Sequence, residues 1–466
     1  MRASRPTATP RADVGSGATT PSEPAPQTAH VRDAATARDD SDPLADPDLP
    51  GTRRDGYVFP DYGGYCFANV PATVGDVLGA DVGRPLPADA LPDGEFSDVL
   101  VLLVDGLGWD RYREREADVP LLDTLASAGR ATPLTSVYPS ETAAAITTMH
   151  TGATPAEHGL LGWNVRLREH GLTCQSLPFT DREGESLQAR TDGAVTGGDL
   201  FDADPVYGRL ADAGVESHAV QAARVAEGPY SEAAMAGATR HGCDSLPELA
   251  VTARRLLERS EDPTYVYAYW SNVDGASHDE GTTSALYDAE LEAVCGAVER
   301  ELARVDPETA DDTLVVLTAD HGHLNADPTS AVDLAEFPDL WRERERHPDG
   351  EPIPPTGGPR NVQLHLRDGA SAQRARERLA EAPFDARLLT GTEALEAGLF
   401  GPGEPSPLLR ERVGDLVVVP RERNVWFGEE GRKLEFVGTH GGQSPEEMYV
   451  PFVAAGLGEW QRHGEG

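Results

Sequence analysis

The sequence predicts an α/β fold in which a mostly parallel central sheet is flanked by helices. From Tyr57 onward, short apolar runs alternate with amphipathic stretches, which is typical of strands that alternate with helices. Residues 98–104 (DVLVLLV) form a nearly continuous apolar run, as expected of a strand that is buried on both faces. Acidic residues and histidines follow several such runs, at the sheet edge where open α/β folds build their sites.

The other elements of the predicted core follow from the same periodicities. Apolar runs without a helical period indicate interior strands, and apolar residues at helical spacing indicate covering helices. The predicted strands are 265–270, 313–318, 415–420 and 450–455, and the predicted helices are 119–128, 247–257 and 285–305.

The N-terminal segment has a different composition. Residues 1–55 are rich in Pro, Ala, Thr, Ser and Asp and have almost no apolar pattern. Such a segment cannot bury enough surface to offset the loss of chain entropy. We therefore predict a disordered tail over residues 1–55.

A second region interrupts the predicted core. Residues 335–412 open with a charged stretch that is rich in Pro and Gly. A strand (361–366), an amphipathic helix (372–379) and a short unit that ends near Phe400 follow. We predict a small inserted α+β cap, which leaves residues 56–334 and 413–466 as the α/β core.

The charge balance is strongly acidic, with 79 Asp and Glu against 40 Lys and Arg and a net charge of −39. Mutual repulsion among carboxylates is tolerable when salt shortens the Debye length to about 3 Å at 1 M. The composition resembles that of cytoplasmic proteins of extreme halophiles, and an ordinary acidic protein is the alternative. Binding to nucleic-acid duplexes or anionic membranes is disfavoured, because both require clusters of Lys and Arg.

The cysteines and the hydropathy pattern indicate a reducing compartment. The four cysteines are far apart, without a CxxC motif, so we expect reduced thiols. No apolar stretch approaches the roughly 20 residues of a membrane span, and the N-terminus has no apolar region of a secretory signal. We expect a cytoplasmic protein; its oligomeric state is not predicted.

Asp105 is the first candidate metal ligand. It follows the apolar run 98–104 and precedes Gly106-Leu107-Gly108. A carboxylate just past a buried strand, with glycines that clear space, suits a metal site. By itself, an aspartate that forms a turn is the simpler interpretation.

Thr142 is the candidate nucleophile. The residues that follow it (AAAITTMHTG) have helical character, so Thr142 should lie at a helix N-terminus, which favours an anion. A metal ion can draw the proton from its hydroxyl group. A threonine that only caps the helix is the alternative.

The remaining candidates are carboxylates and imidazoles in three short motifs. Asp274 and His278 are four positions apart, so one helical turn would let both reach one ion. Asp320 and His321 are adjacent after the run TLVVLT, and His440 lies between glycine-containing segments. Each histidine alone is more often structural, but six such ligands together suit two divalent ions.

These motifs resemble those of the alkaline phosphatase superfamily, and most closely its nucleotide pyrophosphatase/phosphodiesterase branch. The resemblance covers about residues 95–456 and has five parts in the order of that branch: VDGLG, PSETAAAITTMHTGATPAEHG, DGASHDEG, ADHGH and THGG. It implies an alkaline-phosphatase-like fold and hydrolysis of a small phosphate ester or nucleotide through a covalent phospho- or nucleotidyl-threonine.

The resemblance also implies roles for single residues. One ion, most simply Zn²⁺ with Mn²⁺ as an alternative, would be held by Asp105, Asp320 and His321 together with the nucleophile Thr142. The other would be held by Asp274, His278 and His440. Asn164 resembles the asparagine that contacts the phosphate, although its spacing from His158 is one residue longer than in some members. His158 and His323 are expected to support the site or the fold, and Arg360 in the cap is expected to shape the substrate pocket.

Two alternative functions remain open at this stage. A phosphomonoesterase or an enzyme like phosphonoacetate hydrolase would share the metals and the threonine nucleophile. The segment around Thr142 (P-S-E-T) departs from the K-T-F-P-N-H of animal enzymes, which leaves nucleotide specificity undecided. A noncatalytic metal-binding protein is disfavoured, because structural zinc sites favour cysteine ligands.

Overall fold

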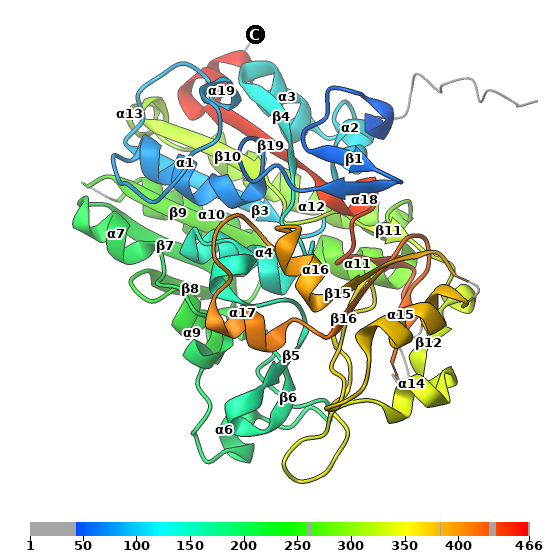
Figure 1. Cartoon of the computed structure of the whole chain (residues 1–466). Helices are drawn as coiled ribbons and strands as arrows, with labels where there is room; N and C mark the ends of the chain where they lie inside the picture. Colours follow the sequence, from blue (N-terminus) through cyan, green and yellow to red (C-terminus); the bar gives the residue numbers. More distant parts are fainter. Residues whose placement is uncertain (1–42, 260–261, 383, 428–434, 465–466) are drawn as a thin grey trace, which may run out of the picture. The chain divides into compact units, whose positions relative to one another are not determined.

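The computed structural model describes residues 43–259, 262–382, 384–427 and 435–464, and most of them belong to two β-sheets with their covering helices (Figure 1). The larger sheet has seven strands in the order β4-β19-β10-β3-β9-β7-β8. The pairs from β10 through β8 are parallel, and β19 is antiparallel to both of its neighbours. This arrangement confirms the predicted α/β class. The strands are β3 (Asp98–Val104), β4 (Arg130–Thr135), β7 (Glu216–Ala222), β8 (Thr239–Cys243), β9 (Thr264–Trp270), β10 (Thr313–Thr318) and β19 (Tyr449–Gly456).

The register of the three central strands positions the site. In the parallel pairs, Leu103 of β3 is aligned with Thr318 of β10 and with Tyr269 of β9. The carboxyl ends of these strands therefore lie at one edge of the sheet. Asp105 follows β3, the segment 319–323 follows β10 and the helix that carries Asp274 follows β9, so the fold brings the predicted ligands together.

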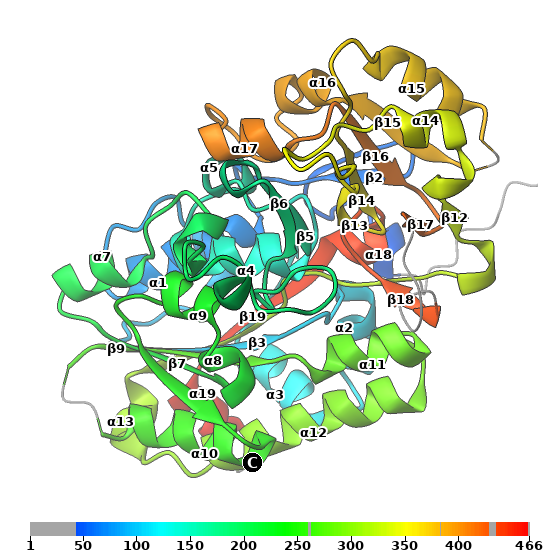
Figure 2. The same cartoon turned by 90° about the horizontal axis from the view of Figure 1, so that it is seen from below.

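Helices cover both faces of the larger sheet (Figure 2). On one face lie α3 (Pro120–Ala128), α10 (Leu246–Leu257), α12 (Ala285–Leu302) and α19 (Leu457–Gly464). On the other lie α1 (Val70–Val77), α4 (Thr142–Thr151), α7 (Tyr207–Asp212) and α9 (Pro229–Ala234). All strand residues of β10 and all but Asp98 of β3 are buried, as expected of strands covered on two faces. Other helices near the sheet are α2 (Trp109–Arg115), α5 (Pro155–His158), α11 (Asn272–Glu280) and α13 (Pro307–Asp311).

The second sheet has six antiparallel strands in the order β15-β16-β14-β13-β5-β6. Its strands come from three parts of the chain, so the sheet extends beyond the predicted insertion 335–412. β5 and β6 precede that insertion, and the predicted late strand 415–420 pairs here and not in the larger sheet. The strands are β5 (Asn164–Leu167), β6 (Leu172–Gln175), β13 (Thr356–Gly358), β14 (Asn361–Leu364), β15 (Ala386–Thr390) and β16 (Leu416–Pro420).

Helices of the second sheet surround a separate apolar cluster. Leu340, Val362, Leu364, Leu379 and Val418 are buried in it. The neighbouring helices are α14 (Pro338–Arg342), α15 (Ala372–Ala380), α16 (Gly391–Glu396) and α17 (Pro407–Arg412).

The chain is folded from Pro43 onward, so the final part of the predicted disordered tail is ordered. β1 (Thr52–Arg54) pairs with β2 (Tyr57–Phe59). The Nε of Arg53 donates to the hydroxyl of Tyr449 at 2.9 Å, which ties this polar segment to the larger sheet. Residues 1–42 of the predicted tail lie outside the described residues.

Two further predictions concern the cysteines and membrane spans. All four cysteines are free and buried, as expected of reduced thiols. Among the described helices, none combines the length and the apolar character that crossing a membrane requires.

Candidate metal centre and nucleophile

The first cluster of candidate ligands lies at the carboxyl ends of β3 and β10. The Nε2 of His321 is 3.5 Å from Asp105 Oδ1 and 3.3 Å from Asp320 Oδ2. Asp320 and His321 are fully buried, and Asp105 is 2% exposed. The three side chains therefore converge on one point beyond the sheet edge.

The two carboxylates of this cluster are only partly satisfied. Asp105 Oδ2 accepts a hydrogen bond from the hydroxyl of Tyr269, and Asp320 Oδ1 accepts one from the amide of Gly106 at 3.1 Å. Their other oxygens, Asp105 Oδ1 and Asp320 Oδ2, are buried without a hydrogen-bond partner among the described residues. Burial, followed by the charge of Asp320, raises the pKa of Asp105, and burial raises the pKa of Asp320 to about 7. Two such carboxylates require a nearby cation to remain ionised.

The second cluster surrounds Asp274 on α11. The Nε2 atoms of three histidines approach Asp274 Oδ1: His323 at 3.0 Å, His278 at 3.4 Å and His440 at 3.5 Å. Burial acts to raise the pKa of Asp274, but the adjacent His278 and the hydrogen bond with His323 outweigh it and lower that pKa. The rings of His321 and His440 stack with their centroids 3.7 Å apart, so the two clusters adjoin.

The orientation of the four imidazoles fits metal binding. Each Nδ1 faces a backbone carbonyl oxygen, which can only accept a hydrogen bond, so Nδ1 carries the proton in each ring. Each Nε2 then presents a lone pair toward a carboxylate, an arrangement that a bound cation stabilises. The four contacts are His278 with Gly438 (2.7 Å), His321 with Gly322 (3.1 Å), His323 with Gly106 (3.2 Å) and His440 with Ser140 (3.1 Å).

Thr142 lies at the start of α4, as predicted, but it does not cap the helix. The N-cap residue is Glu141. The Oγ1 of Thr142 lies 3.0 Å from the Nε2 of His321, beside the first cluster. The exposed amides and the dipole of the ten-residue helix favour a negative charge at this end, so Thr142 stands where an anion and a cation can both be bound.

Two glycines in the motifs are required by close contacts. A Cβ on Gly106, whose φ is +76°, would lie 2.4 Å from Cε1 of His323. A Cβ on Gly322 would lie 2.1 Å from the carbonyl oxygen of Glu446. Larger residues would displace the loops that carry Asp105 and His321.

The segment that carries Asn164 forms another wall of the site. Asn164 begins β5, and its Nδ2 donates to the carbonyl oxygen of Gly357 at 3.2 Å. The preceding Trp163 is 37% exposed, and its amide donates to Glu141 Oε2 at 2.7 Å. Burial raises the pKa of Glu141 to about 8.

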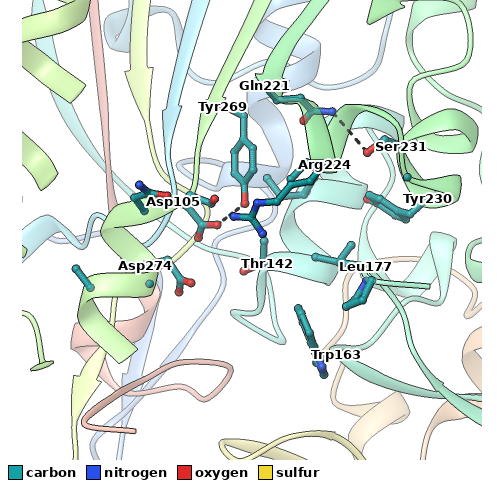
Figure 3. Close-up of a pocket in the computed structure, with 18 of the residues that line it drawn as sticks. Asp105, Thr142, Trp163, Leu177, Gln221, Arg224, Tyr230, Ser231, Tyr269 and Asp274 are labelled. Atoms are coloured by element: carbon teal, nitrogen blue, oxygen red, sulfur yellow. Dashed lines mark hydrogen bonds between the residues drawn. The ribbon is translucent and has the colours of Figure 1, made fainter. Parts of the chain in front are cut away.

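Two cavities meet at Thr142. The larger, of about 650 Å³, extends from Asp105, Thr142 and Asp274 to Arg224 and Tyr230 (Figure 3). The smaller, of about 220 Å³, is bounded by His278, His440 and an aromatic group made of Trp163, Trp426, Phe427 and Phe436. Thr142, Trp163 and Asp274 line both cavities.

The structure also places three other residues whose roles were predicted, His323, His158 and Arg360. His323, expected only to support the site, places its Nε2 among the ligand atoms of the second cluster. His158 is fully buried and its Nε2 contacts Thr148 Oγ1 at 3.1 Å, away from both clusters, as expected of a supporting residue. Arg360 does not line either cavity: it is fully buried, with its Nε and Nη2 bonded to Glu447 at 3.0 and 2.8 Å. The neighbouring Gly358 and Pro359 line the smaller cavity instead.

Several residues of the cavity walls were not predicted from the sequence. Arg224, Tyr269 and the aromatic residues Trp426, Phe427 and Phe436 belong to no recognisable motif.

Comparisons with known proteins identify the family and the fold of the chain. The family described as type I phosphodiesterase/nucleotide pyrophosphatase matches residues 99–443, whereas the comparison with curated proteins found no match. The fold is similar to that of murine ectonucleotide pyrophosphatase/phosphodiesterase 5, with a TM-score of 0.57, 17% identity, and coverage of 76% of this chain and 87% of the murine chain. An inactive threonine-to-alanine variant of the murine protein in complex with AMP gives a TM-score of 0.58 at 17% identity, over 77% and 88% of the two chains.

A bacterial structure is also similar. Phosphonoacetate hydrolase from Sinorhizobium meliloti, in complex with phosphonoformate, gives a TM-score of 0.54 and 17% identity over 82% of this chain and 97% of its own. The family match covers most of the chain, and the structures agree on an alkaline-phosphatase-like fold. The chain therefore belongs to the type I phosphodiesterase/nucleotide pyrophosphatase family of the alkaline phosphatase superfamily, and is a metal-dependent phosphoric ester hydrolase.

Proposed function

We propose that this protein is a two-metal phosphodiesterase in which Thr142 forms a covalent intermediate with the phosphoryl group. The proposal is supported by the position of Thr142 Oγ1, 3.0 Å from the Nε2 of His321 in the first ligand cluster. Thr142 also lines the smaller cavity together with Asp274, His278 and His440 of the second cluster. In all, Thr142 lines two cavities, which provide space for the two substituents of a phosphodiester.

The ligand sets favour two divalent ions, with Zn²⁺ proposed and Mn²⁺ as the alternative. Asp105, Asp320, His321 and Thr142 would hold one ion, and Asp274, His278 and His440 the other. Imidazole and carboxylate ligands without cysteine suit a catalytic zinc site with an open position. When bound, the ions would acidify the threonine hydroxyl and neutralise charge on the attacking and leaving oxygens.

The proposed reaction has two displacements at phosphorus. In the first, Thr142 Oγ1 forms a bond to phosphorus while the bond from phosphorus to the leaving oxygen breaks. The threonine proton passes to solvent and the leaving oxygen takes up a proton. In the second, water attacks the phospho- or nucleotidyl-threonine, the bond from Oγ1 to phosphorus breaks, and Thr142 regains a proton. The amides at the start of α4 stabilise the negative charge of the phosphoryl group in both steps.

The two cavities support a diester in preference to a monoester. A phosphodiester carries two substituents on phosphorus, and each needs space beside the nucleophile. The smaller cavity, with its four aromatic side chains, suits a planar apolar substituent. The larger cavity can hold a polar one. A monoester would occupy only one of them.

The similar structures make two substrate types plausible in chemical terms. The murine protein was solved with AMP and the bacterial enzyme with phosphonates. We propose a small phosphodiester or nucleotide as the substrate, and retain a phosphonate like phosphonoacetate, or a phosphomonoester, as the alternative. Bis(p-nitrophenyl) phosphate and p-nitrophenyl phosphate should separate these proposals, because the diester should react faster. A higher kcat/KM for the monoester would refute the diester assignment.

Thr142→Ala tests the nucleophile. Turnover of the diester should fall by roughly 10³-fold or more, because the covalent route is lost, while elemental analysis should still find bound metal. Thr151→Ala is the matched control, since Thr151 ends the same helix and its Oγ1 donates to the carbonyl oxygen of Thr147. Unchanged activity in Thr142→Ala would eliminate the proposed nucleophile.

The composition supports a salt-adapted cytoplasmic setting. A net charge of −39 is best tolerated where salt screens the repulsion between carboxylates. The four free, buried thiols fit a reducing compartment. Assays in molar KCl are therefore the appropriate starting conditions.

A further inference from the structure

Arg224 projects into the larger cavity from α8 (Ala223–Ala226), directly after β7. Figure 3 shows the guanidinium end of this side chain directed toward Asp105 and Thr142. Its location at the carboxyl edge of the sheet places it on the same side of the fold as both ligand clusters. Arg224 is thus a wall of the site and not a residue of a distant surface.

The charge of Arg224 is exceptional among the residues that line this cavity. The other charged side chains there are the acids Asp105, Asp274, Asp279 and Glu290, and Arg224 is the sole basic one in the described lining. In the described part of the chain, its guanidinium has no hydrogen bond or ion pair. By contrast, Arg254 on the opposite face of the sheet bonds Glu301 at 3.0 Å. An arginine without a partner, facing a cavity in a strongly acidic protein, is available to a ligand.

The chemistry of the guanidinium defines the class of that ligand. Its planar N–H groups match the paired oxygens of a phosphate or carboxylate. Metal ions would neutralise the carboxylates of the two clusters, but Asp279 and Glu290 would still repel an additional negative charge on the substrate. Arg224 offsets that repulsion on the side of the cavity that adjoins Thr142.

We propose that Arg224 binds a second anionic group of the substrate, phosphate or carboxylate, carried by the substituent next to the reacting phosphorus. This inference rests on the proposed function, since it assumes attack by Thr142 on a phosphorus atom at the mouth of the cavity. It makes Arg224 a specificity-determining residue: substrates with a pyrophosphate-like or carboxylated substituent are preferred over those with a neutral one.

Three matched esters test the proposal. They are p-nitrophenyl methylphosphonate, p-nitrophenyl carboxymethylphosphonate and p-nitrophenyl phosphonomethylphosphonate, which differ only in the group on the carbon next to phosphorus. All carry one negative charge at the reacting phosphoryl group, and release of p-nitrophenol reports the same bond cleavage in each. The second and third esters distinguish a carboxylate from a phosphate-like group as the preferred anion.

Arg224→Met should lower kcat/KM for the two esters with an anionic substituent by roughly 10- to 100-fold, the usual effect of losing a hydrogen-bonded charge pair. The methylphosphonate ester, whose substituent on phosphorus is uncharged, should change by less than about threefold. Arg224→Lys should fall between, because it keeps the charge and loses the planar fork. Melting temperature and metal content should equal those of the wild type.

Two results would overturn the inference. Equal losses for all three esters would mean that Arg224 contacts the reacting phosphoryl group or only maintains the fold, and unchanged rates would mean that it binds no part of the substrate. If the wild-type protein hydrolyses none of the esters, bis(p-nitrophenyl) phosphate identifies which proposal has failed. If that diester is hydrolysed, only the Arg224 inference is refuted. If it is not hydrolysed, the proposed function is refuted.

Discussion

Replacing Arg360 by methionine is expected to destabilise the protein strongly, although Arg360 is remote from the reacting groups. Its guanidinium forms two bonds with the carboxylate of Glu447, and it also donates to the carbonyl oxygens of Arg421 and Arg423, each at 2.9 Å. Glu447 in turn accepts from the amide of Gly442 at 2.8 Å. Both charged side chains are fully buried, so the pair joins the turn between β13 and β14 of the second sheet to α18 (Pro445–Met448).

The size of the stability loss in Arg360→Met follows from the polar groups that the substitution leaves without a partner. Methionine fills much of the volume of Arg360 but leaves the Glu447 carboxylate buried without its counter-ion, and two carbonyl oxygens lose their donor. Removing one partner of a buried ion pair costs about 3–5 kcal/mol. The double variant Arg360→Met/Glu447→Gln no longer has the buried charge and should recover about 2 kcal/mol or more of that loss.

Urea unfolding at 0.1 M and 2 M KCl measures both the loss and its salt dependence. An exposed pair provides the control: Arg376 and Glu393 are 2.9 Å apart, with side chains that are 36% and 45% exposed. Arg376→Met should cost less than about 1 kcal/mol and less still in high salt. The reasoning is refuted if Arg360→Met costs no more than Arg376→Met, or if salt weakens the two effects equally.

Two further predictions concern the acidic groups of the site. Because burial raises the pKa of Glu141 to about 8, its contribution to stability is fully present below its unfolded pKa of about 4.5 and is lost as the pH rises through 8. Glu141→Gln, which stays neutral, should therefore gain stability over the wild type by about 1.4 kcal/mol per pH unit across that range, and thermal melts in which the difference stays constant from pH 5 to 9 would contradict this. Removal of metal by a chelator should abolish turnover and lower the melting temperature, because ions that bind only the folded state stabilise it; Zn²⁺ should restore both properties, and in Thr142→Ala it should restore the melting temperature alone.

The sequence predicts the central strands well because burial on both faces requires a continuous run of apolar residues. β3 and β10 are surrounded by other elements on both faces, so nearly every position is apolar and the bounds 98–104 and 313–318 match those observed. β7 (ESHAVQA) and β8 (TRHGC) lack such runs. Because of their polar residues, neither strand is predicted from the sequence. β8 also lies at the edge of the sheet, where it pairs on one side only.

The second sheet exceeds the predicted insertion for a related reason. Its strands are three or four residues long, except β15 and β16, which have five, and such short runs carry little periodicity. β5 begins at Asn164 as part of the segment that follows α4, so its pairing with β13 through Gly357 depends on a contact between residues far apart in sequence. Local patterns cannot reveal which strand will be its neighbour.

The chemistry of the site was more accessible to sequence than its shape. Metal ligands must have particular side chains, and their positions after strands are fixed by the fold, so Asp105 and His440 could be proposed as candidate ligands from the sequence. The cavity walls have no such requirement. Trp426 or Arg224 is recognisable only when tertiary packing places it beside Thr142.

The candidate metal ligands and the wall of the smaller cavity come from different parts of the fold. Most candidate metal ligands lie on loops and a helix that follow buried strands of the larger sheet. His440 is the exception, because it follows β18 (Gly438–Thr439), which pairs with β11 (Leu324–Asn325) in a separate two-stranded sheet. Much of the smaller cavity is instead built by β5 and β13 of the second sheet and by β17 (Val425–Trp426), through Asn164, Gly358 and Trp426. Since different elements carry the reactive groups and most of this wall, a side chain such as Trp426 can change with little effect on the ligands. Phe436 is the exception, because its ring stacks on that of His278 with the centroids 4.5 Å apart. A substrate preference set by such a wall therefore cannot be inferred from the ligand motifs alone.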